Sequence, residues 1–330
     1  MRQTVEPILE ISDLQTHFFT KAGILRAVDG VSFEIGAGEI VGLVGESGSG
    51  KSITGFSIIG LVDSPGEIIG GTIKFKGEDL NDLSNERMQH VRGNRIAMIF
   101  QDPMMTLNPV LRIETQMIEA IQAHDNKISR EDARIRSRDA LGLVGISSPD
   151  ERLRAYPHQF SGGMRQRVSI AIAMLNRPDL IIADEPTTAL DVTIQGQVIS
   201  EMQKLCRETK TALLWITHDL AVIAGIADRV CVMYAGRIVE QGLVANTIAN
   251  PLHPYTRGLM GSVPSQNQRG KPLQQINGMV PSMLSLPRGC AFQNRCSYVT
   301  EKCSTERPDI THLSDERQVR CFNLSEVPKL

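Results

Sequence analysis

The sequence predicts an α/β protein with a largely parallel sheet. Short, wholly apolar runs of strand-forming residues alternate with helix-like segments, as in strands joined by crossover helices. One such run ends in a glycine-rich turn that opens a helix at Lys51. Near residue 250 the composition shifts to Pro, Gly, Gln and Ser, and four of the six cysteines follow that shift. We therefore expect a core over residues 1–250 and a small extension over residues 251–330.

The expected strands are short and apolar, and their length favours a buried strand over a helix. They cover residues 8–14, 31–35, 39–44, 96–100, 180–183, 212–216 and 230–234. The extension shows few strand or helix signals. It is too short to bury a large core, so a stabilising cross-link such as a bound metal would benefit it.

Between Gln101 and Gln159 the pattern becomes helical, and we expect a helical subdomain at about residues 102–165. Ser129 followed by Asp132 resembles a capping signal at a helix N-terminus. Asp132 and Arg136 lie one helical turn apart and can pair on a solvated face. This charged stretch is more typical of a surface helix than of a nucleic-acid-binding patch.

The composition excludes several classes of protein. The chain has 330 residues and a mass of 36.3 kDa, with 41% hydrophobic and 22% charged residues, so it is not mostly disordered. Its formal net charge of −2 argues against a general electrostatic grip on nucleic acid or on an anionic membrane. Aromatic residues make up only 4%, which does not suggest a platform for base stacking.

The sequence also predicts that the chain does not cross a membrane. Its longest apolar stretch without charges runs from Ile53 to Val62, which is shorter than the ~20 residues of a spanning helix. The N-terminus carries acidic residues where a signal peptide has an apolar core. We expect a cytoplasmic protein with few disulfides, in which Cys206 and Cys231 are small buried apolar residues.

The glycine-rich turn predicts a phosphate site. The run Gly45-Glu46-Ser47-Gly48-Ser49-Gly50-Lys51-Ser52 matches G-x-x-x-x-G-K-[ST], and it follows a strand and opens a helix that continues with Ile53. Glycines let successive backbone N–H groups point inward at phosphate oxygens, and the helix N-terminus adds its positive dipole end. Lys51 would reach the β- and γ-phosphates, and the Ser52 hydroxyl would bind Mg²⁺. The motif occurs once, so we expect one nucleotide-binding core for ATP.

An acidic strand end supplies the second half of such a site. The run Leu180–Glu185 is an apolar strand that ends in two carboxylates. Asp184 can reach the Mg²⁺ shell, and Glu185 can orient the attacking water or accept its proton. Together the two motifs predict a P-loop NTPase.

Further motifs, in order along the chain, make the sequence resemble the ABC ATPases. Phe160–Arg167 reads FSGGMRQR, which is similar to the signature usually written LSGGQ, and it lies shortly before the Asp184 strand. Gln101 matches the Q-loop, Ala189–Asp191 the D-loop, and His218 the switch histidine. The chain is thus identified as a member of the ABC transporter ATP-binding subunits. The resemblance implies a P-loop core with an antiparallel β N-terminal part and a helical subdomain.

The resemblance implies a shared ATP site between two subunits. Ser161, Gly162 and Gly163 would offer free N–H groups at a helix start to the γ-phosphate held by the opposite subunit. Asp191 of the D-loop would belong to the same ATP-binding set. Two ATP molecules would then be sandwiched in a dimer.

Three other residues receive roles from the resemblance. His218 would contact the γ-phosphate and sense its loss. Gln101 would touch the metal or the water and link the site to the membrane partner. Phe18 stands where the family has an aromatic that stacks on adenine, although a strand phenylalanine is often only a core residue.

One departure from the family pattern narrows the resemblance. Met164 replaces the usual Gln of the signature, and FSGGMRQRV resembles one subunit type of the dipeptide, oligopeptide and nickel uptake systems. QDPMMTLNPV, HPYTRGL and the cysteine segment point the same way. The resemblance implies a second ATPase subunit, two permeases and an extracytoplasmic solute-binding protein, at the cytoplasmic face of the inner membrane. Peptides are the favoured cargo, and nickel, glutathione and oligosaccharides are alternative cargoes.

The cysteine segment predicts a metal site. Its spacing is Cys290-x5-Cys296-x6-Cys303-x17-Cys321, and thiolates in a reduced compartment are typical metal ligands. Zinc sites usually use C-x2–4-C pairs, which this segment lacks, whereas iron–sulfur clusters take four cysteines at more variable spacing. The resemblance adds that some relatives hold a [4Fe–4S] cluster there. We expect such a cluster, with zinc or unmetallated thiols as alternatives.

Two rival functions stay open at this point. A soluble ABC ATPase that acts on nucleic acid or ribosomes commonly has two nucleotide domains, coiled coils or basic extensions, and this chain shows none of these signals. A non-catalytic binding module that uses its tail for redox or metal sensing is disfavoured by the intact Lys51, Asp184 and Glu185.

Overall fold

The computed structural model describes residues 6–187, 190, 192–262 and 275–324, which form two compact units. The helical unit comprises Gly36–Glu39, Asp82–Leu214 and the N-terminal residues up to Ile8. The phosphate-loop unit comprises Leu9–Ile35, Ile40–Asn81 and the chain from Trp215 onward. Strand β8 (Ala212–Thr217) crosses the boundary between them in the sequence.

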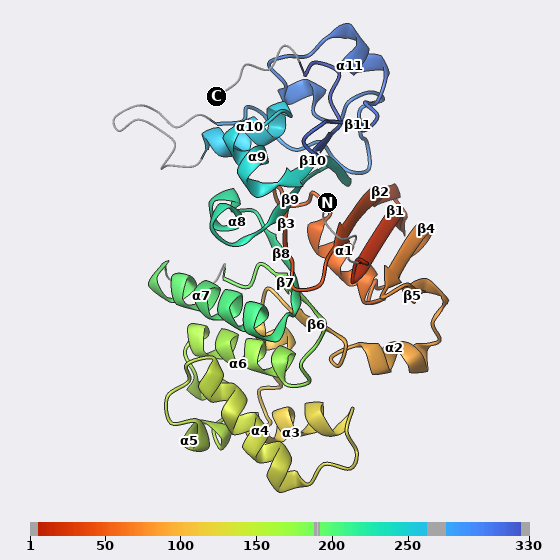
Figure 1. Ribbon diagram of the computed structural model, residues 1–330. Helices are drawn as coiled ribbons and strands as arrows, with labels where there is room; N and C mark the ends of the chain where they lie inside the picture. Colours follow the sequence, from red (N-terminus) through yellow and green to blue (C-terminus); the bar gives the residue numbers. More distant parts are fainter. Residues whose placement is uncertain (1–5, 188–189, 191, 263–274, 325–330) are drawn as a thin grey trace. The chain divides into compact units, whose positions relative to one another are not determined.

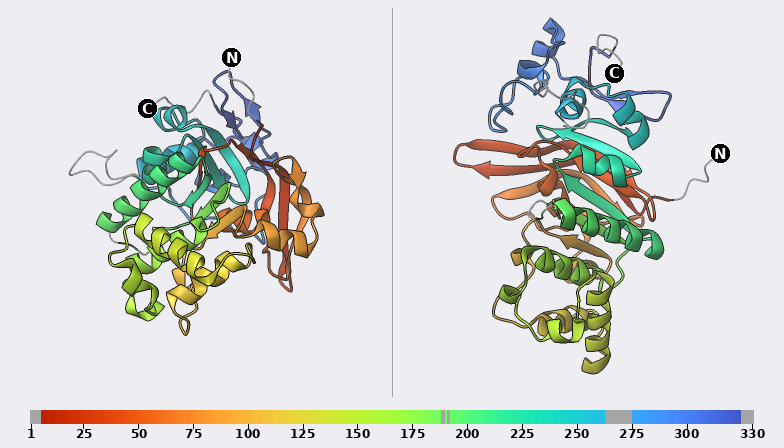
Figure 2. Two further views of the ribbon diagram at one scale, coloured as in Figure 1. Left: turned by 60° about the horizontal axis from the view of Figure 1, so that its bottom comes forward. Right: turned by 90° about the vertical axis from the view of Figure 1, so that its left-hand side faces the viewer.

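The phosphate-loop unit contains an antiparallel sheet formed near the N-terminus. Its strand order is β2-β1-β4-β5, with β1 (Leu9–Thr20), β2 (Gly23–Ile35), β4 (Gly66–Phe75) and β5 (Glu78–Asp79). Figure 2 shows these strands side by side, with β1 paired to both β2 and β4. The antiparallel part implied by the resemblance is therefore present.

Five further strands of this unit are neighbours in the order β11-β12-β10-β9-β3. The strands are β3 (Ile40–Val44), β9 (Arg229–Tyr234), β10 (Arg237–Leu243), β11 (Thr311–His312) and β12 (Gln318–Val319). Strand β3 pairs parallel with β9, so their carboxyl ends share one edge, and every residue of β3 is buried. The phosphate loop follows β3 directly and thus starts at that edge.

The helices of this unit are short. They are α1 (Lys51–Ile58), η1 (Leu80–Asp82), α8 (Leu220–Ile226), α9 (Val244–Ala249), α10 (Pro254–Gly261), η5 (Gln293–Arg295) and α11 (Glu301–Thr305). Helix α8 packs so closely on β3 that a Cβ atom at Gly42 would lie 2.5 Å from Ile223.

The helical unit contains parallel strands and a group of helices. Its strands are β6 (Ile96–Ile99) and β7 (Leu180–Asp184), which pair in parallel, with β8 next to β7. Its helices are α2 (Asn85–Val91), η2 (Pro103–Met105), α3 (Ile113–Gln122), α4 (Arg130–Leu143), α5 (Pro149–Leu153), η3 (Pro157–Gln159), α6 (Gly162–Met174) and α7 (Val192–Thr209). Figure 1 shows α3, α4, α5 and α6 gathered in one group, as expected for the helical insertion.

The core is formed by large apolar side chains from both kinds of element. Trp215, Tyr234, Tyr255, Leu9 and Ile11 are among the largest fully buried side chains. Burial of one such side chain stabilises the fold by about 1.5–3 kcal/mol. Cys206 and Cys231 are buried and form no disulfide with any described residue, which confirms their prediction as small core residues.

The expected strands all exist, and the structure lengthens several of them. The run 8–14 is the start of β1, which continues to Thr20, because the residues beyond Leu14 still pair with β2. The helix expected at Lys51 begins there. Ser129 caps α4 by accepting the Asp132 N–H at 3.0 Å, which confirms the predicted cap.

The predicted pair between Asp132 and Arg136 is wrong. Asp132 accepts the Ser129 hydroxyl at 2.6 Å instead. The Arg136 guanidinium donates to the Leu175 carbonyl and to the Asn176 side chain. Leu175 ends α6, where the last carbonyls have no partner within the helix, so an arginine donor is drawn to them.

The extension has more regular structure than its sequence predicts. Strand β12 pairs antiparallel with β10, with Glu240 opposite Val319, and α10 begins directly after His253. The Glu240 carboxylate, fully buried, accepts the N–H groups of Leu252 and His253 at 3.0 and 2.9 Å. These contacts join the extension to a core strand through its backbone, which composition alone cannot reveal.

Candidate functional site

Two glycines of the phosphate loop, Gly45 and Gly50, leave no room for a side chain. A Cβ atom at Gly45 would lie 2.2 Å from the Met233 carbonyl oxygen. Gly50 has a φ of +104°, and a Cβ atom there would lie 2.1 Å from the Ala27 carbonyl oxygen. Ser47 and Gly48 are exposed, and Gly48 borders open space. The loop therefore presents its tip outward while its two ends pack on backbone.

Lys51 is folded over the same loop. Its buried ammonium group donates to the carbonyls of Gly45 and Glu46 at 2.8 and 2.9 Å, and it lies 3.5 Å from the Ser49 hydroxyl. These hydrogen bonds hold the charge beside the loop. Ser52 and Ile53 follow in the first turn of α1 and are half-buried.

Phe18 and His218 belong to the same unit. Phe18 is half-buried on β1, and its ring lies against Gly66, where a Cβ atom would be 2.7 Å from it. His218 follows β8 and is exposed. The next residue, Asp219, caps α8 by accepting the N–H groups of Ala221 and Val222.

The helical unit holds the acidic strand end. Asp184 closes β7 and its residue surface is 4% exposed. Glu185 follows with a φ of +45°, a left-handed conformation that costs a non-glycine residue about 1–3 kcal/mol. Such strain at a residue expected to position water fits a site whose geometry matters more than local stability.

Gln101 lies at the same edge of this unit as Asp184. Strands β6 and β7 run parallel with Ile99 opposite Ala183, so their carboxyl ends meet. Gln101 is exposed two residues beyond β6. The structure thus brings the ends that carry these two predicted residues onto one edge.

The signature lies at the start of a long helix. Ser161 caps α6, and its hydroxyl accepts the Met164 N–H at 3.3 Å. Ser161 and Gly162 are exposed, and with Gly163 they line a surface hollow that also includes Arg152 and Arg167. Free N–H groups and two nearby guanidinium groups suit an anion. Ala189 and Asp191 of the D-loop lie outside the described residues.

The four tail cysteines line one cavity, which we call the four-cysteine cavity. His253, Phe292 and Phe322 are among its other lining residues. The Tyr298 N–H donates to Cys296 Sγ at 3.4 Å, and the Asn323 N–H donates to Cys321 Sγ at 3.4 Å. The cavity-lining cysteines are Cys290, Cys296, Cys303 and Cys321.

Burial governs the chemistry of this cavity. Burial raises the pKa of the Cys290 and Cys296 thiols above the ordinary value. It raises the pKa of the Cys321 thiol to about 11. It also lowers the pKa of the fully buried His253 to about 3. Across the described part of the chain, no three metal-ligating side chains converge as closely as a single bound ion requires. The four thiols are therefore gathered around one cavity, but the described residues form no ion site there.

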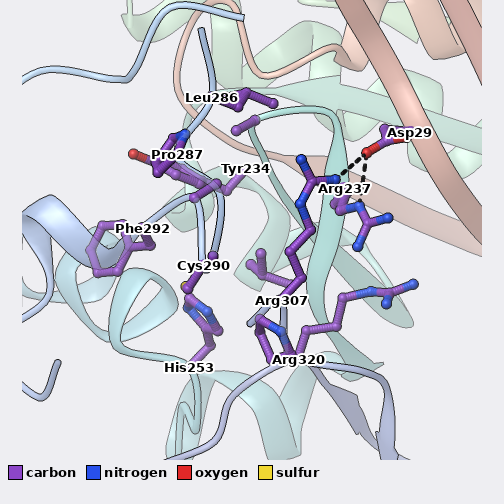
Figure 3. Close-up of a pocket in the computed structure, with 15 residues that line it drawn as sticks. Asp29, Tyr234, Arg237, His253, Leu286, Pro287, Cys290, Phe292, Arg307 and Arg320 are labelled. Atoms are coloured by element: carbon purple, nitrogen blue, oxygen red, sulfur yellow. Dashed lines mark hydrogen bonds and ion pairs between the residues drawn. The ribbon is translucent and has the colours of Figure 1, made fainter. Parts of the chain in front are cut away.

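A second cavity, beside Cys290, has a charged wall (Figure 3). Asp29 accepts from Arg237 and Arg307, both at 3.1 Å, and links strand β2 to β10 and to the extension. Arg320 also lines the cavity, and its buried Nε atom has no hydrogen-bond partner within the described residues. Sequence reasoning assigned none of these residues a role.

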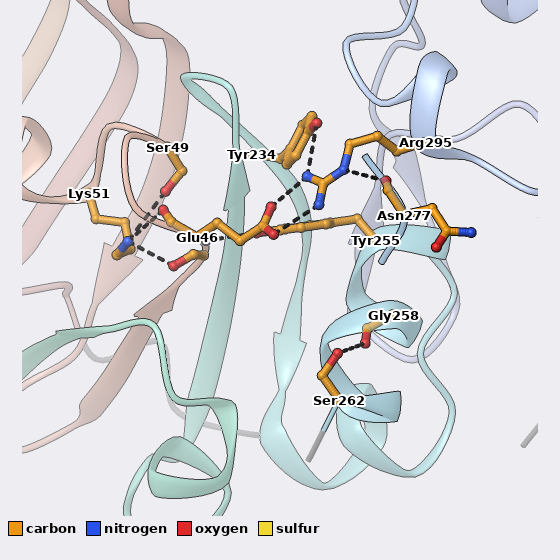
Figure 4. A network of polar contacts seen from close by, with 10 residues as sticks. Glu46, Ser49, Lys51, Tyr234, Tyr255, Gly258, Ser262, Asn277 and Arg295 are labelled. Carbon is orange, nitrogen blue, oxygen red and sulfur yellow. Dashed lines mark hydrogen bonds and ion pairs between the residues drawn. The ribbon is translucent and has the colours of Figure 1, made fainter. Parts of the chain in front are cut away.

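Sequence reasoning also missed two residues of the extension that contact the phosphate loop. Tyr255 and Arg295 both reach Glu46, the first variable residue of the loop (Figure 4). The HPYTRGL motif was the available signal for Tyr255. Arg295 carried no signal beyond its place next to Cys296.

A glycine-shaped phosphate loop, an acidic strand end and a serine-capped signature helix together define an ABC-type ATP-binding protein. Comparisons with known proteins agree. Residues 28–188 match the family model described as ABC transporter, and residues 239–303 match the one described as oligopeptide/dipeptide transporter, C-terminal region. The oligopeptide transport ATP-binding protein AppD of Bacillus subtilis is 48% identical over 97% of each chain. The dipeptide transport ATP-binding protein DppD of Escherichia coli is 45% identical, covering 95% of this chain and 96% of that protein.

Solved structures show the same cassette. The dimeric ATP-binding cassette MJ0796, in a post-hydrolysis state bound to ADP and Pi, aligns with a TM-score of 0.65 and 26% identity. The alignment covers 72% of this chain and 98% of that one. The chain belongs to the family of ABC transporter ATP-binding proteins that includes AppD and DppD. It is an ABC-type ATPase, and ATP with Mg²⁺ are the cofactors of this class. None of the helices in the described ranges has the length and apolar character to span a bilayer.

Proposed function

We propose that the chain is the ATP-hydrolysing motor of an importer for di- or oligopeptides. The observation that carries this proposal is the likeness to peptide transport ATP-binding proteins over nearly the whole chain, extension included. Nickel or glutathione import by the same motor is the alternative, because cargo choice lies mainly outside the ATPase. A division of the chain into an ATPase core, residues 1–250, and an extension, residues 251–330, belongs to the same proposal.

The phosphate-loop residues would bind the nucleotide. The N–H groups of Gly45–Gly50 would cradle the phosphates, and Lys51 would leave its carbonyl partners for the β- and γ-phosphates. Ser52 and Asp184 would hold Mg²⁺. Phe18 would stack on the adenine, and Ile53 would pack beside the nucleotide.

Hydrolysis would use the carboxylate that follows β7. Glu185 would accept a proton from the attacking water, with Gln101 touching the metal or that water. His218 would contact the γ-phosphate and respond to its loss. The strained backbone of Glu185 supports a positioning requirement at this residue.

The signature would complete the site of a second subunit. Ser161, Gly162 and Gly163 are exposed or half-buried at the start of a 13-residue helix, so their N–H groups are available to a γ-phosphate from outside the chain. Asp191 would join this contact. We propose that the second subunit is a different ATPase, which gives a heterodimer.

The remaining partners follow from the family. A peptide ABC importer implies permeases and a solute-binding protein, and its ATPase subunits associate peripherally with the membrane. We propose two permeases, a binding protein outside the cytoplasm and a location at the cytoplasmic face of the inner membrane. We propose no nucleic-acid partner.

Reconstitution tests this function. In liposomes that contain the permeases and the second ATPase, peptide-loaded binding protein is expected to raise the rate of ATP hydrolysis. Stimulation by nickel or glutathione but not by peptides would transfer the proposal to that cargo. Stimulation of the isolated chain by nucleic acid, with no permeases recovered from membranes, would favour the soluble alternative.

We also propose that the four-cysteine cavity binds a [4Fe–4S] cluster, with Cys290, Cys296, Cys303 and Cys321 as ligands. The donor set fits, because four thiols line one cavity and receive N–H hydrogen bonds of the kind that tune cluster sulfurs. A cluster spans more volume than one ion, so it suits thiols that do not converge on a point. Burial disfavours bare thiolates, and iron would offset this cost. Zinc is the alternative.

Metal analysis tests the cluster. Anaerobically purified protein is expected to be brown and to contain about four irons per chain. Replacement of Cys296 by alanine should remove the colour, while the matched change Cys206→Ala, at a buried thiol outside the cavity, should leave it unchanged. Stoichiometric zinc without iron would overturn the cluster.

A further inference from the structure

The extension holds the phosphate loop through a partly buried ion pair. Arg295 Nη1 donates to Glu46 Oε2 at 2.6 Å, and Nη2 donates to Glu46 Oε1 at 3.0 Å. The pair is thus bidentate, the geometry in which arginine binds a carboxylate most firmly. The Arg295 side chain is 4% exposed and that of Glu46 is 31% exposed. We call Glu46, Tyr255 and Arg295 the loop clamp (Figure 4).

Every polar group of Glu46 is engaged. Its backbone N–H donates to the Tyr255 hydroxyl at 2.8 Å, and its carbonyl accepts from Lys51 at 2.9 Å. Its carboxylate takes the two bonds from Arg295. The loop residue is therefore fixed at both backbone and side chain, and two of its partners, Tyr255 and Arg295, come from residues beyond 250.

Arg295 is itself held in place by its surroundings. Its Nε donates to the Asn277 carbonyl at 3.1 Å, and its guanidinium lies 5.8 Å from the ring centroids of Tyr234 and Phe292. Tyr234, Tyr255 and Phe292 pack together, with ring centroids 4.6 to 5.5 Å apart. Phe292 and Arg295 both lie between Cys290 and Cys296, so the clamp is continuous with the four-cysteine cavity.

We propose that Arg295 and Tyr255 are positioning residues for the phosphate loop, and that through them the extension sets the affinity of the chain for MgATP. The proposal rests on the proposed ATP site. A loop that is already held in its binding form loses little conformational freedom when phosphate enters. Without the clamp, the loop occupies that form for only part of the time, and the apparent affinity falls by the same fraction.

Binding measurements on the full-length chain test the clamp. In Arg295→Met, the dissociation constant for MgATP, measured by calorimetry, is expected to rise about tenfold. The KM for ATP should rise with it, while kcat at saturating ATP changes little, because Arg295 does not reach the reacting atoms. Arg295→Lys should restore part of the affinity. The matched control is Arg317→Met, since Arg317 is a buried arginine of the extension that bonds Asp315 and the Asn250 carbonyl instead of the loop.

A double-variant comparison separates the clamp from a general loss of stability. Glu46→Gln and Arg295→Met should each weaken binding, and the two together should weaken it no more than the stronger one alone. If Arg295→Met does not fold, Tyr255→Phe decides, because it removes only the hydroxyl that accepts the Glu46 N–H. Folded Arg295→Met or Tyr255→Phe protein with unchanged MgATP affinity overturns the clamp. A wild-type chain that binds no MgATP overturns the proposed function instead.

Discussion

Replacing Glu185 with glutamine is expected to lower kcat for ATP hydrolysis by about 10²–10⁴-fold. The amide can still orient a water molecule but cannot accept its proton. MgATP binding should stay near the wild-type level, because the phosphate loop lies in a different segment of the chain. Phosphate release gives the rate and calorimetry the affinity.

The same variant should also retain ATP long enough to reveal the dimer. With MgATP and the second ATPase present, Glu185→Gln is expected to elute as a dimer in size-exclusion chromatography. Glu208→Gln is the matched control, since Glu208 is an exposed α7 carboxylate whose side chain pairs only loosely with Lys204, at 3.8 Å. A normal hydrolysis rate in Glu185→Gln would show that another group takes the proton.

Replacing Gly50 with alanine is expected to abolish measurable MgATP binding. The new Cβ atom would lie 2.1 Å from the Ala27 carbonyl oxygen, which is backbone and cannot swing away, and the φ of +104° is itself costly for alanine. Either the loop or β2 must shift, and the N–H groups no longer converge on phosphate. Calorimetry with MgATP and thermal unfolding measure the two effects.

Gly77→Ala separates the clash from the backbone conformation. Gly77 also has a positive φ, +81°, but a Cβ atom there would meet nothing within 4 Å. We expect this control to cost only about 1–2 kcal/mol of stability and to bind MgATP normally. If Gly50→Ala binds MgATP within threefold of wild type, the loop is not held as tightly as the glycine contacts require.

Local sequence signals predicted the strands and the phosphate loop well, because both depend on neighbouring residues. The apolar runs of β3, β7 and β8 predict that these strands are buried, as they are. The glycines of the phosphate loop predict its turn. Ser129 was predictable as a cap for the same reason.

Long-range contacts were not predictable from local patterns. Arg136 was expected to pair within its own helix, but it bonds a carbonyl 39 residues away. Glu46 and Arg295 are separated by 249 residues, and the local sequence around neither residue predicts their contact. Strands β11 and β12 have two residues each, too few to show a period. The roles of Gln101, His218 and Phe18 rest on resemblance, since a single residue after a strand carries no pattern.

Strand β12 also protects its neighbour. It occupies the side of β10 that does not pair with β9, and β10 would otherwise present open N–H and C=O groups to solvent. Shortened forms of the chain that end near residue 250 would carry this bare strand, which is a template for pairing with other molecules. Such forms should aggregate during expression even where the nucleotide pocket is complete. Truncation is therefore expected to lower the yield of soluble protein before it lowers the ATPase activity of the protein that stays in solution.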